Sequence, residues 1–267
     1  MTVAPARPAS TVVLLRPTAS RFDVFLVRRH DKVAFMGGAH VFPGGRVDAA
    51  DAWLGDENAD RVAAVRELFE EAGVLLARRG NGAGIDLDDA AEAERFRQYR
   101  PALASGSLAL RDVVERERLE LDLDALTWFA HWVTPEIEIK RFDTRFFVAV
   151  APAGQHPVHD DSETTHSEWM DPTTAVERCR REEIALPPPT WTTLRTLARF
   201  RRVEDVISWA RSRPVVRVQP GFIKTDEVTM LTLPGDPTYP PIQGFETPEE
   251  TRFVLAGGRW RVAGRDE

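Results

Sequence analysis

The sequence predicts an α/β fold of the α+β kind, in which helices cover both faces of a mixed sheet. Short segments rich in β-branched and aromatic residues alternate along the chain with longer helix-favouring segments. Long gaps separate the first predicted strands from the later ones, which favours a mixed sheet. With 267 residues, of which 43% are hydrophobic, the chain is long enough to bury a large core.

Two strands and one strong helix are predicted in the first half of the chain. Residues 11–15 (TVVLL) and 22–28 (FDVFLVR) have the composition of strands. Residues 60–77 give the strongest helix prediction, and RRGNGAG at 78–84 ends that helix. The charged, helix-favouring residues 87–120 predict two further helices, inserted after the first.

The second half of the chain begins with two more predicted strands. These strands, 126–133 and 145–151, are apolar enough to be buried. Helices are predicted at 190–201 and 203–211, after the LPPP break. The tail, 214–267, contains two weak strand signals among turns.

Composition excludes several classes of protein. The formal net charge of −7 argues against a nucleic-acid partner, because binding to the phosphate backbone needs a basic surface. Cys179 is the only cysteine, so neither an intrachain disulfide nor a cysteine-based zinc site can form. The N-terminus lacks an apolar core of signal-peptide length, and no apolar run reaches membrane-spanning length. We therefore expect a cytoplasmic protein without a membrane partner.

The helix predicted at 60–77 has three glutamates on one face. With about 100° per residue, Glu67, Glu70 and Glu71 lie opposite the apolar face around Val65. Like charges at this spacing destabilise a helix by a few tenths of a kcal/mol per pair. Two interpretations are open, a solvated surface face or a site for a divalent cation such as Mg²⁺, which prefers carboxylate oxygens.

The glutamates belong to a longer pattern that begins at FPGG, where Gly44 and Gly45 indicate a tight turn or a close backbone approach. The stretch GG…AAVRELFEEAGV resembles the Nudix box, G-x5-E-x7-R-E-U-x-E-E-x-G-U, in which U is aliphatic. Gly45 matches the opening glycine. The second half of the box is matched by Arg66, Glu67, Leu68, Glu70, Glu71, Gly73 and Val74.

One part of the box departs from the pattern. The loop between Gly45 and Arg66 is about seven residues longer than the pattern allows. The early glutamate of the box is therefore not assignable from the sequence. The candidates for its place are Asp51, Asp56, Glu57 and Asp60.

Further motifs resemble the peroxisomal coenzyme A diphosphatase branch of the Nudix family and its bacterial relatives. They are GAHVFPGG, WVTPE, KRFDTRFFVA, ALPPPTWTTL and LPGDPTYP, together with the lengthened loop. The resemblance implies a Nudix-type α/β/α sandwich over residues 1–202, with a helical insertion at about 85–122. Residues 203–267 would form a C-terminal extension packed on the same domain.

The resemblance also implies an activity, which is hydrolysis of a nucleoside diphosphate linked to another group. In this branch the substrate is coenzyme A or acyl-coenzyme A, cleaved to 3′,5′-ADP and (acyl)phosphopantetheine with Mg²⁺ or Mn²⁺. ADP-ribose, NADH or a nucleotide sugar is an alternative substrate. A non-catalytic Nudix-fold sensor of nucleotides is an alternative of another class. A homodimer is a further expectation from the family.

The resemblance assigns the metal to four residues of the box. Its ligands would be Glu67, Glu70, Glu71 and the carbonyl oxygen of Gly45, while Arg66 orients the glutamates. The general base in this family is either a box glutamate or an acid on a distant loop, and the segment 156–169, which has the composition of a polar loop, offers such acids.

Two acids of that segment, Glu163 and Glu168, are candidates for such an acid, and Glu168 is the residue we select as catalytic. The phosphates of a coenzyme A substrate need cations. For this purpose we select four basic residues near the ends of predicted strands, which are Arg28, Lys140, Arg141 and Arg145.

Overall fold

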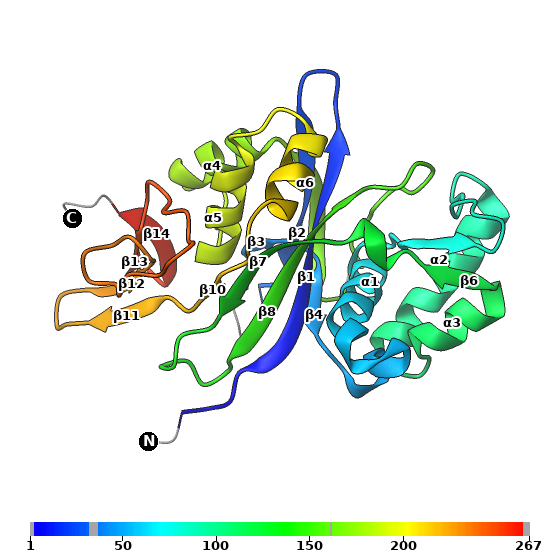
Figure 1. The fold of residues 1–267 in the computed structure, drawn as a ribbon, viewed down its shortest axis with the longest axis horizontal. Coiled ribbons are helices and arrows are strands. Elements are labelled where there is room, and N and C mark those ends of the chain that lie inside the picture. The colour runs from blue at the N-terminus through cyan, green and yellow to red at the C-terminus, as the bar shows by residue number, and fades with distance from the viewer. Residues whose placement is uncertain (1–2, 32–36, 161, 264–267) are drawn as a thin grey trace.

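An eight-stranded mixed sheet lies at the centre of the computed structural model, which describes residues 3–31, 37–160 and 162–263 (Figure 1). Its strands are β1 (Arg7–Pro17), β2 (Phe22–Arg29), β3 (His40–Val41), β4 (Gly44–Arg46), β7 (Thr127–Val133), β8 (Phe142–Val150), β9 (Thr164–Met170) and β10 (Arg217–Val218). The order is β10-β7-β8-β1-β2-β3, with β4 paired to β1 and β9 paired to β2. The pairs β1–β8 and β7–β10 are parallel and the others antiparallel, so the predicted mixed sheet is confirmed.

Helices cover both faces of this sheet, as Figure 1 shows. One face packs against α1 (Ala59–Ala72), α2 (Ala90–Ala104) and α3 (Leu110–Glu117), and the other against α4 (Pro172–Arg180), α5 (Pro188–Leu197) and α6 (Val203–Arg211). Alternation along β1 creates the two cores, because Val12 and Leu14 point to the first group of helices and Val13 and Leu15 to the second.

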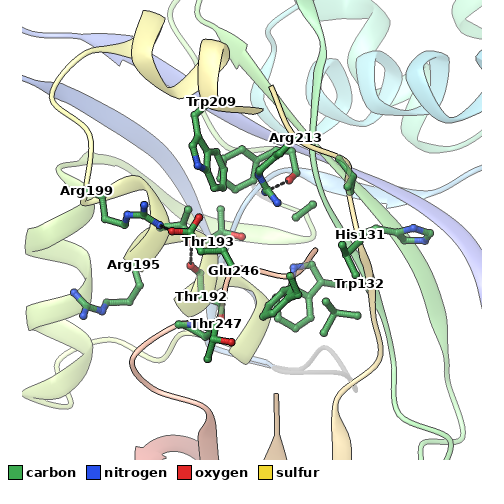
Figure 2. Close-up of a pocket in the computed structure, with 18 of the residues that line it drawn as sticks. His131, Trp132, Thr192, Thr193, Arg195, Arg199, Trp209, Arg213, Glu246 and Thr247 are labelled. Carbon is green, nitrogen blue, oxygen red and sulfur yellow. Dashed lines mark hydrogen bonds and ion pairs between the residues drawn. The ribbon is translucent and has the colours of Figure 1, made fainter. Parts of the chain in front are cut away.

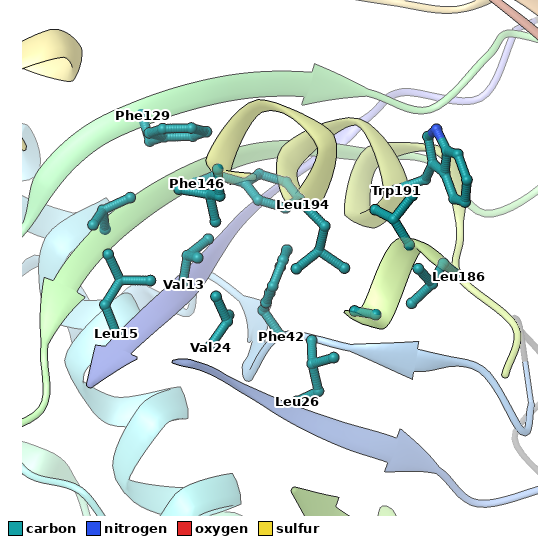
Figure 3. Packing of buried hydrophobic residues seen from close by; sticks show 14 of the residues in the cluster. Val13, Leu15, Val24, Leu26, Phe42, Phe129, Phe146, Leu186, Trp191 and Leu194 are labelled. Carbon is teal, nitrogen blue, oxygen red and sulfur yellow. The ribbon is translucent and has the colours of Figure 1, made fainter. Parts of the chain in front are cut away.

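Figure 3 shows the second of these cores, where Val13 and Leu15 lie near Val24, Phe146 and Leu194. Large aliphatic and aromatic side chains from the strands fill the space beneath α5. Such close packing fixes the sheet that carries the site.

The glutamate-bearing helix α1 ends earlier than predicted. The prediction extended to residue 77, but the helix ends at Ala72, where Gly73 takes φ +73° and its N–H donates to the carbonyl of Phe69. The apolar run after Gly73 is buried although it is not helical. It leads into β5 (Ala77–Arg79), which pairs with β6 (Leu119–Leu121).

The two helices predicted within 87–120 are confirmed as α2 and α3. Asp89 caps α2 by accepting a hydrogen bond from the N–H of Glu92 at 2.8 Å. Arg100 of α2 donates to the carbonyl oxygens of Glu70 and Glu71, the last of which is 3.1 Å away. The insertion therefore packs directly on the glutamate-bearing half of α1.

The interpretation of residues 156–169 as a polar loop is wrong for their second half. Thr164–Met170 form β9, which pairs antiparallel with β2, and α4 follows directly. Exposed polar side chains such as Thr165 and His166 conceal the strand pattern, because only Thr164 and Met170 are buried. Asp171 and Pro172 are typical of a helix start, and the prediction missed this signal for α4.

The C-terminal part of the chain contributes to both the main sheet and a second sheet. Helix α6 and strand β10, which belong to the predicted extension 203–267, pack with the main sheet. The second sheet is antiparallel and consists of β11 (Gly221–Lys224), β12 (Thr229–Thr232), β13 (Arg252–Ala256) and β14 (Arg259–Ala263). Both weak strand signals of the tail lie within it.

Short 3₁₀ helices complete the secondary structure. They are η1 (Ala49–Leu54), η2 (Asp56–Asn58) and η3 (Leu123–Ala125). The first two occupy the lengthened loop of the box. In the described ranges, no helix is both long enough and apolar enough to cross a lipid bilayer.

Candidate active site

The glutamates of α1 lie against the backbone of β4. The N–H of Gly44 donates to Oε2 of Glu71 at 3.0 Å. A Cβ atom on Gly45 would fall 2.4 Å from Oε1 of Glu67, closer than non-bonded atoms approach. The FPGG turn therefore needs glycine at position 45 because the carboxylate of Glu67 occupies the space of a side chain.

Arg66 joins the box loop to the helix. Its Nε and Nη2 donate to the two carboxylate oxygens of Asp51 at 2.9 and 3.0 Å. Its Nη1 donates to Glu67 at 2.9 Å and to Glu70 at 3.2 Å, and its Nη2 also reaches the carbonyl of Arg46 at 2.7 Å. Burial alone would lower the pKa of Arg66, but the bond to Asp51 and the charges of the glutamates raise it above its ordinary value. Arg66 stays cationic and positions the carboxylates.

Asp51 stands out among the four acids of the lengthened loop. It is 2% exposed, and the N–H of Asp48 donates to its Oδ2 at 2.8 Å. Asp60 instead pairs with Arg145 at 2.5 Å, and Asp56 and Glu57 are exposed. The structure thus gives Asp51 alone, among these four, the contact with Arg66.

Negative charge at this site is incompletely neutralised. Burial, with the neighbouring acids Glu70 and Glu163, raises the pKa of Glu67 to about 7, although Arg66 opposes the shift. Burial and the charge of Glu67 raise the pKa of Glu71 well above its ordinary value. Burial likewise raises the pKa of Glu70.

The carboxylates of Glu67 and Glu70 share one donor, Nη1 of Arg66, whereas Glu71 accepts from the N–H of Gly44. Within the part of the chain that the structure describes, no three Asp, Glu, His or Cys side chains are grouped as a metal site. The oxygen donors that a hard cation prefers are nevertheless all on one side of α1, and burial makes the ionised forms of Glu67 and Glu71 costly without a cation.

Two further residues act on this cluster, Glu163 and Arg29. The charge of Glu163 raises the pKa of both Glu67 and Glu71. Arg29, at the end of β2, lowers the pKa of Glu71, although burial of Glu71 outweighs it. The Nε of Arg29 is buried and has no hydrogen-bond partner within the described residues. The sequence alone could not show that Glu163 rather than Glu168, and Arg29 rather than Arg28, lies near the glutamates. That distinction depends on the register between β2 and β9.

Glu168 contacts Arg178 and His40. Its carboxylate accepts from Nη1 of Arg178 at 3.0 Å and lies 3.4 Å from Nε2 of His40. Burial lowers the pKa of His40 to about 4, against the opposing charge of Glu168, so His40 is neutral at pH 7. The ion pair with Arg178 occupies Glu168.

The four selected cations are spread over the molecule. Arg141 is 7% exposed and donates to the carbonyls of Ala4 and Thr134 and to Oε1 of Gln219, so its guanidinium holds the N-terminal segment in place. Its selection as a phosphate contact conflicts with this burial, because each of its nitrogens already has a protein acceptor. The strand pattern could not reveal these distant acceptors.

The other three selected cations are at least partly exposed. Arg145 is paired with Asp60, and its guanidinium lies 5.8 Å from the ring centre of Trp128. Lys140 is exposed in the turn between β7 and β8. Arg28 pairs with Asp31 at 2.7 Å, one residue before Arg29.

A groove of about 510 Å³ begins beside Glu70. Its walls come from the end of α1, from α2, from residues 156–160 and from Ser162, and they include Ala93, Arg97 and Val158. The helical insertion therefore forms one wall of a space that opens next to the glutamates.

Comparison with known proteins identifies the family. Residues 51–197 match the family model described as the NUDT19 Nudix domain, which is more than half of the chain. The chain belongs to the Nudix hydrolase family. A human relative named acyl-coenzyme A diphosphatase NUDT19 is 30% identical over 91% of this chain and 80% of its own length. The Xenopus laevis protein of the same name is 26% identical over 83% of this chain and 72% of its own length.

A solved structure supports the Nudix fold. The Nudix hydrolase from Alicyclobacillus acidocaldarius superposes with a TM-score of 0.69 and 29% identity, covering 78% of this chain and 97% of that one. The expected α/β/α Nudix sandwich is thus confirmed, as is the resemblance to the coenzyme A diphosphatase branch. Enzymes of this family generally use divalent cations.

Proposed function

We propose that this Nudix hydrolase cleaves the diphosphate of coenzyme A or acyl-coenzyme A, giving 3′,5′-ADP and (acyl)phosphopantetheine. The observation that carries the proposal is the set of three intact box glutamates on α1, held against Gly44 and Gly45. The substrate comes from the two relatives named acyl-coenzyme A diphosphatase, which align with most of this chain.

The site residues fit a divalent cation, which we propose to be Mg²⁺ or Mn²⁺. Glu67, Glu70 and Glu71 would hold it, with the Gly45 carbonyl as a further donor, because these oxygens are the type that hard cations prefer. When bound, the cation offsets the negative charge that develops on the diphosphate oxygens. Burial, with a smaller effect of neighbouring acids, raises the pKa of Glu67 and Glu71, and a bound cation would stabilise their ionised forms.

Other residues of the site position the glutamates or accept a proton. Arg66 fixes the carboxylates of Glu67 and Glu70 through its own anchor on Asp51. Hydrolysis forms a bond between the water oxygen and phosphorus and breaks the bridging P–O bond, and the two protons of water are released to a base and to the leaving phosphate. We infer that Glu163 is the base, because its charge acts on Glu67 and Glu71 whereas Glu168 is paired with Arg178.

The substrate would lie across the glutamates, with its two ends on different elements. Arg29, whose guanidinium has a buried, unbonded Nε, would contact a phosphate. The groove beside Glu70 has mostly apolar lining from α1 and α2, which suits the pantetheine arm or an acyl chain. The insertion would thus determine which group is accepted beyond the diphosphate.

The test is hydrolysis of a panel consisting of coenzyme A, acetyl-coenzyme A, NADH, ADP-ribose and a nucleotide sugar. Each compound is incubated with EDTA, Mg²⁺ or Mn²⁺, and products are identified by mass. We expect 3′,5′-ADP from coenzyme A or acetyl-coenzyme A in the presence of either metal and none with EDTA. Preferred cleavage of ADP-ribose, NADH or the nucleotide sugar would contradict the proposed substrate but agree with the proposed class of reaction. Absence of turnover with every compound would favour the nucleotide-sensor alternative.

Exchanging the two candidate acids distinguishes their roles. Glu163→Gln is expected to lower kcat by about 100-fold, because loss of a general base removes a proton acceptor from the reaction. Glu168→Gln is expected to change kcat less than about fivefold and to destabilise the fold by at most about 1 kcal/mol, since Arg178 loses one of its two acid partners and keeps Glu183. Steady-state kinetics and urea unfolding measure both effects. A larger loss of kcat in Glu168→Gln would return the catalytic role to Glu168.

Compartment and assembly complete the proposal. A single free cysteine, Cys179, is compatible with a reducing compartment, and we propose the cytoplasm. Burial raises the pKa of the Cys179 thiol, which keeps it protonated and unreactive. A homodimer stays a prediction, which light scattering would test.

A further inference from the structure

A second cavity lies on the face of the sheet opposite the glutamates. It has a volume of about 340 Å³, is open to solvent on one side, and is bordered by β7, α5, the end of α6 and the loop of residues 245–250 (Figure 2). Its strand residues Phe129 and Trp132 belong to the core under α4–α6, whereas α1 packs on the other side. The cavity is therefore separate from the groove beside Glu70.

The α5 wall of this cavity contains polar groups that lack partners. Thr192 and Thr193 line the cavity and are 7% and 2% exposed, and their hydroxyls are buried without a hydrogen-bond partner among the described residues. The Nε of Arg213 is likewise buried and unbonded. Burial without a partner costs free energy for each of these groups, which a bound ligand would recover.

Arg213 is a positive charge held in a fixed position. Its guanidinium stacks 3.7 Å from the ring centre of Trp209, and Nη2 donates to the carbonyl of Phe129 at 2.9 Å (Figure 2). Burial lowers the pKa of Arg213 while the charge of Glu246 opposes this shift, and Glu246 is itself ion-paired with Arg199 at 2.6 Å. Arg213 thus offers donors to a ligand from a preorganised position.

The loop of residues 245–250 places three acids along the cavity. Glu246 pairs with Arg199, and Glu249 and Glu250 pair with Arg195 at 2.5 and 3.1 Å. Both arginines are on or just after α5 and line the cavity. The loop therefore neutralises the arginines at the rim but leaves Arg213 further inside.

We propose that this cavity is a binding site for a small organic anion, a phosphate ester or carboxylate, whose charged group contacts Arg213. The threonine hydroxyls would donate to the same group, and the body of the ligand would pack on Phe129 and Trp132. Glu246 competes with the ligand, because its carboxylate acts on the same cation. This proposal is independent of the diphosphatase function.

Calorimetric titration in EDTA tests the proposal with three probes, namely adenosine 5′-monophosphate, hexanoate and inorganic phosphate. We expect saturable binding of at least one organic probe, tighter than that of inorganic phosphate because apolar walls contribute. Arg213→Met should weaken it at least about tenfold, and Glu246→Gln should tighten it about three- to tenfold. The organic probe that binds more tightly identifies the ligand as a phosphate ester or a carboxylate.

Glu227→Gln is the matched control for Glu246→Gln, because Glu227 is exposed in the turn between β11 and β12 and the change in net charge is the same. It should leave the affinity unchanged. Glu246→Gln keeps the test decisive if Arg213→Met does not fold. The proposal is overturned if neither organic probe binds to the wild type or to Glu246→Gln at about 10 mM, or if binding is unaffected by both cavity variants.

Discussion

Glu67→Gln is expected to stabilise the metal-free protein above pH 7 while lowering kcat by roughly 100-fold or more. Both effects have the same origin, the buried charge of Glu67. Burial raises the pKa of this carboxyl from 4.5 to about 7, so its ionised form is costly in the folded protein. A ligand of a divalent cation is needed in the ionised form, and its loss removes charge stabilisation from the transition state.

The direction of the pH effect follows from proton binding. Between pH 4.5 and 7 the folded protein holds a proton on Glu67 that the unfolded chain has released. Its contribution to the free energy of unfolding is fully present below pH 4.5 and is lost as the pH rises through 7, by roughly 3 kcal/mol at most. Glutamine does not titrate, so the advantage of the variant should be absent at pH 4.5 and largest above pH 7.

Urea unfolding in EDTA at pH 5 and pH 8, with kcat measured in Mg²⁺, checks this prediction. Glu227→Gln again provides an exposed control, with unchanged stability and activity. Addition of Mg²⁺ at pH 8 should stabilise the wild type more than Glu67→Gln, because the cation binds the folded state and compensates the charge. A variant that loses stability and activity together would show that Glu67 has a structural role instead.

The sequence predicted the box and its helix because their pattern is local. The face of Glu67, Glu70 and Glu71 follows from helical periodicity, and the need for glycine at 45 follows from a turn signal. The structure adds the reason for this glycine, which is the carboxylate of Glu67 in the place of a Cβ atom.

Contacts between distant segments could not be predicted in the same way. Glu163 and Glu168 are equally acidic neighbours in the sequence, but the pairing of β9 with β2 gives them different surroundings. Arg141 has the strand-end position expected of a phosphate contact, yet its partners Ala4 and Gln219 lie far away in the chain. Such partners depend on tertiary packing, which no local pattern contains.

The lengthened loop combines a local pattern with a contact between distant segments. Mutation of its acids should change both stability and activity. Asp51→Asn is expected to destabilise the fold by about 3 kcal/mol, because it breaks a buried ion pair and leaves Arg66 partly unpaired. Both carboxylate oxygens of Asp51 accept hydrogen bonds. The NH₂ group of the new asparagine would therefore face a donor, either the guanidinium of Arg66 or the N–H of Asp48. Activity should fall as well, since Arg66 positions Glu67 and Glu70.

The other three acids of the loop supply graded controls, measured by urea unfolding and by kcat. Asp56→Asn and Glu57→Gln should change stability by less than about 0.5 kcal/mol, because both side chains are exposed. Asp60→Asn should cost about 1 kcal/mol through its pair with Arg145. If Glu57→Gln or Asp60→Asn proved more damaging than Asp51→Asn, the early acid of the box would lie at that position. The expected order instead follows from burial, because the insertion moves the acid along the chain while Arg66 still requires a buried carboxylate in the same place.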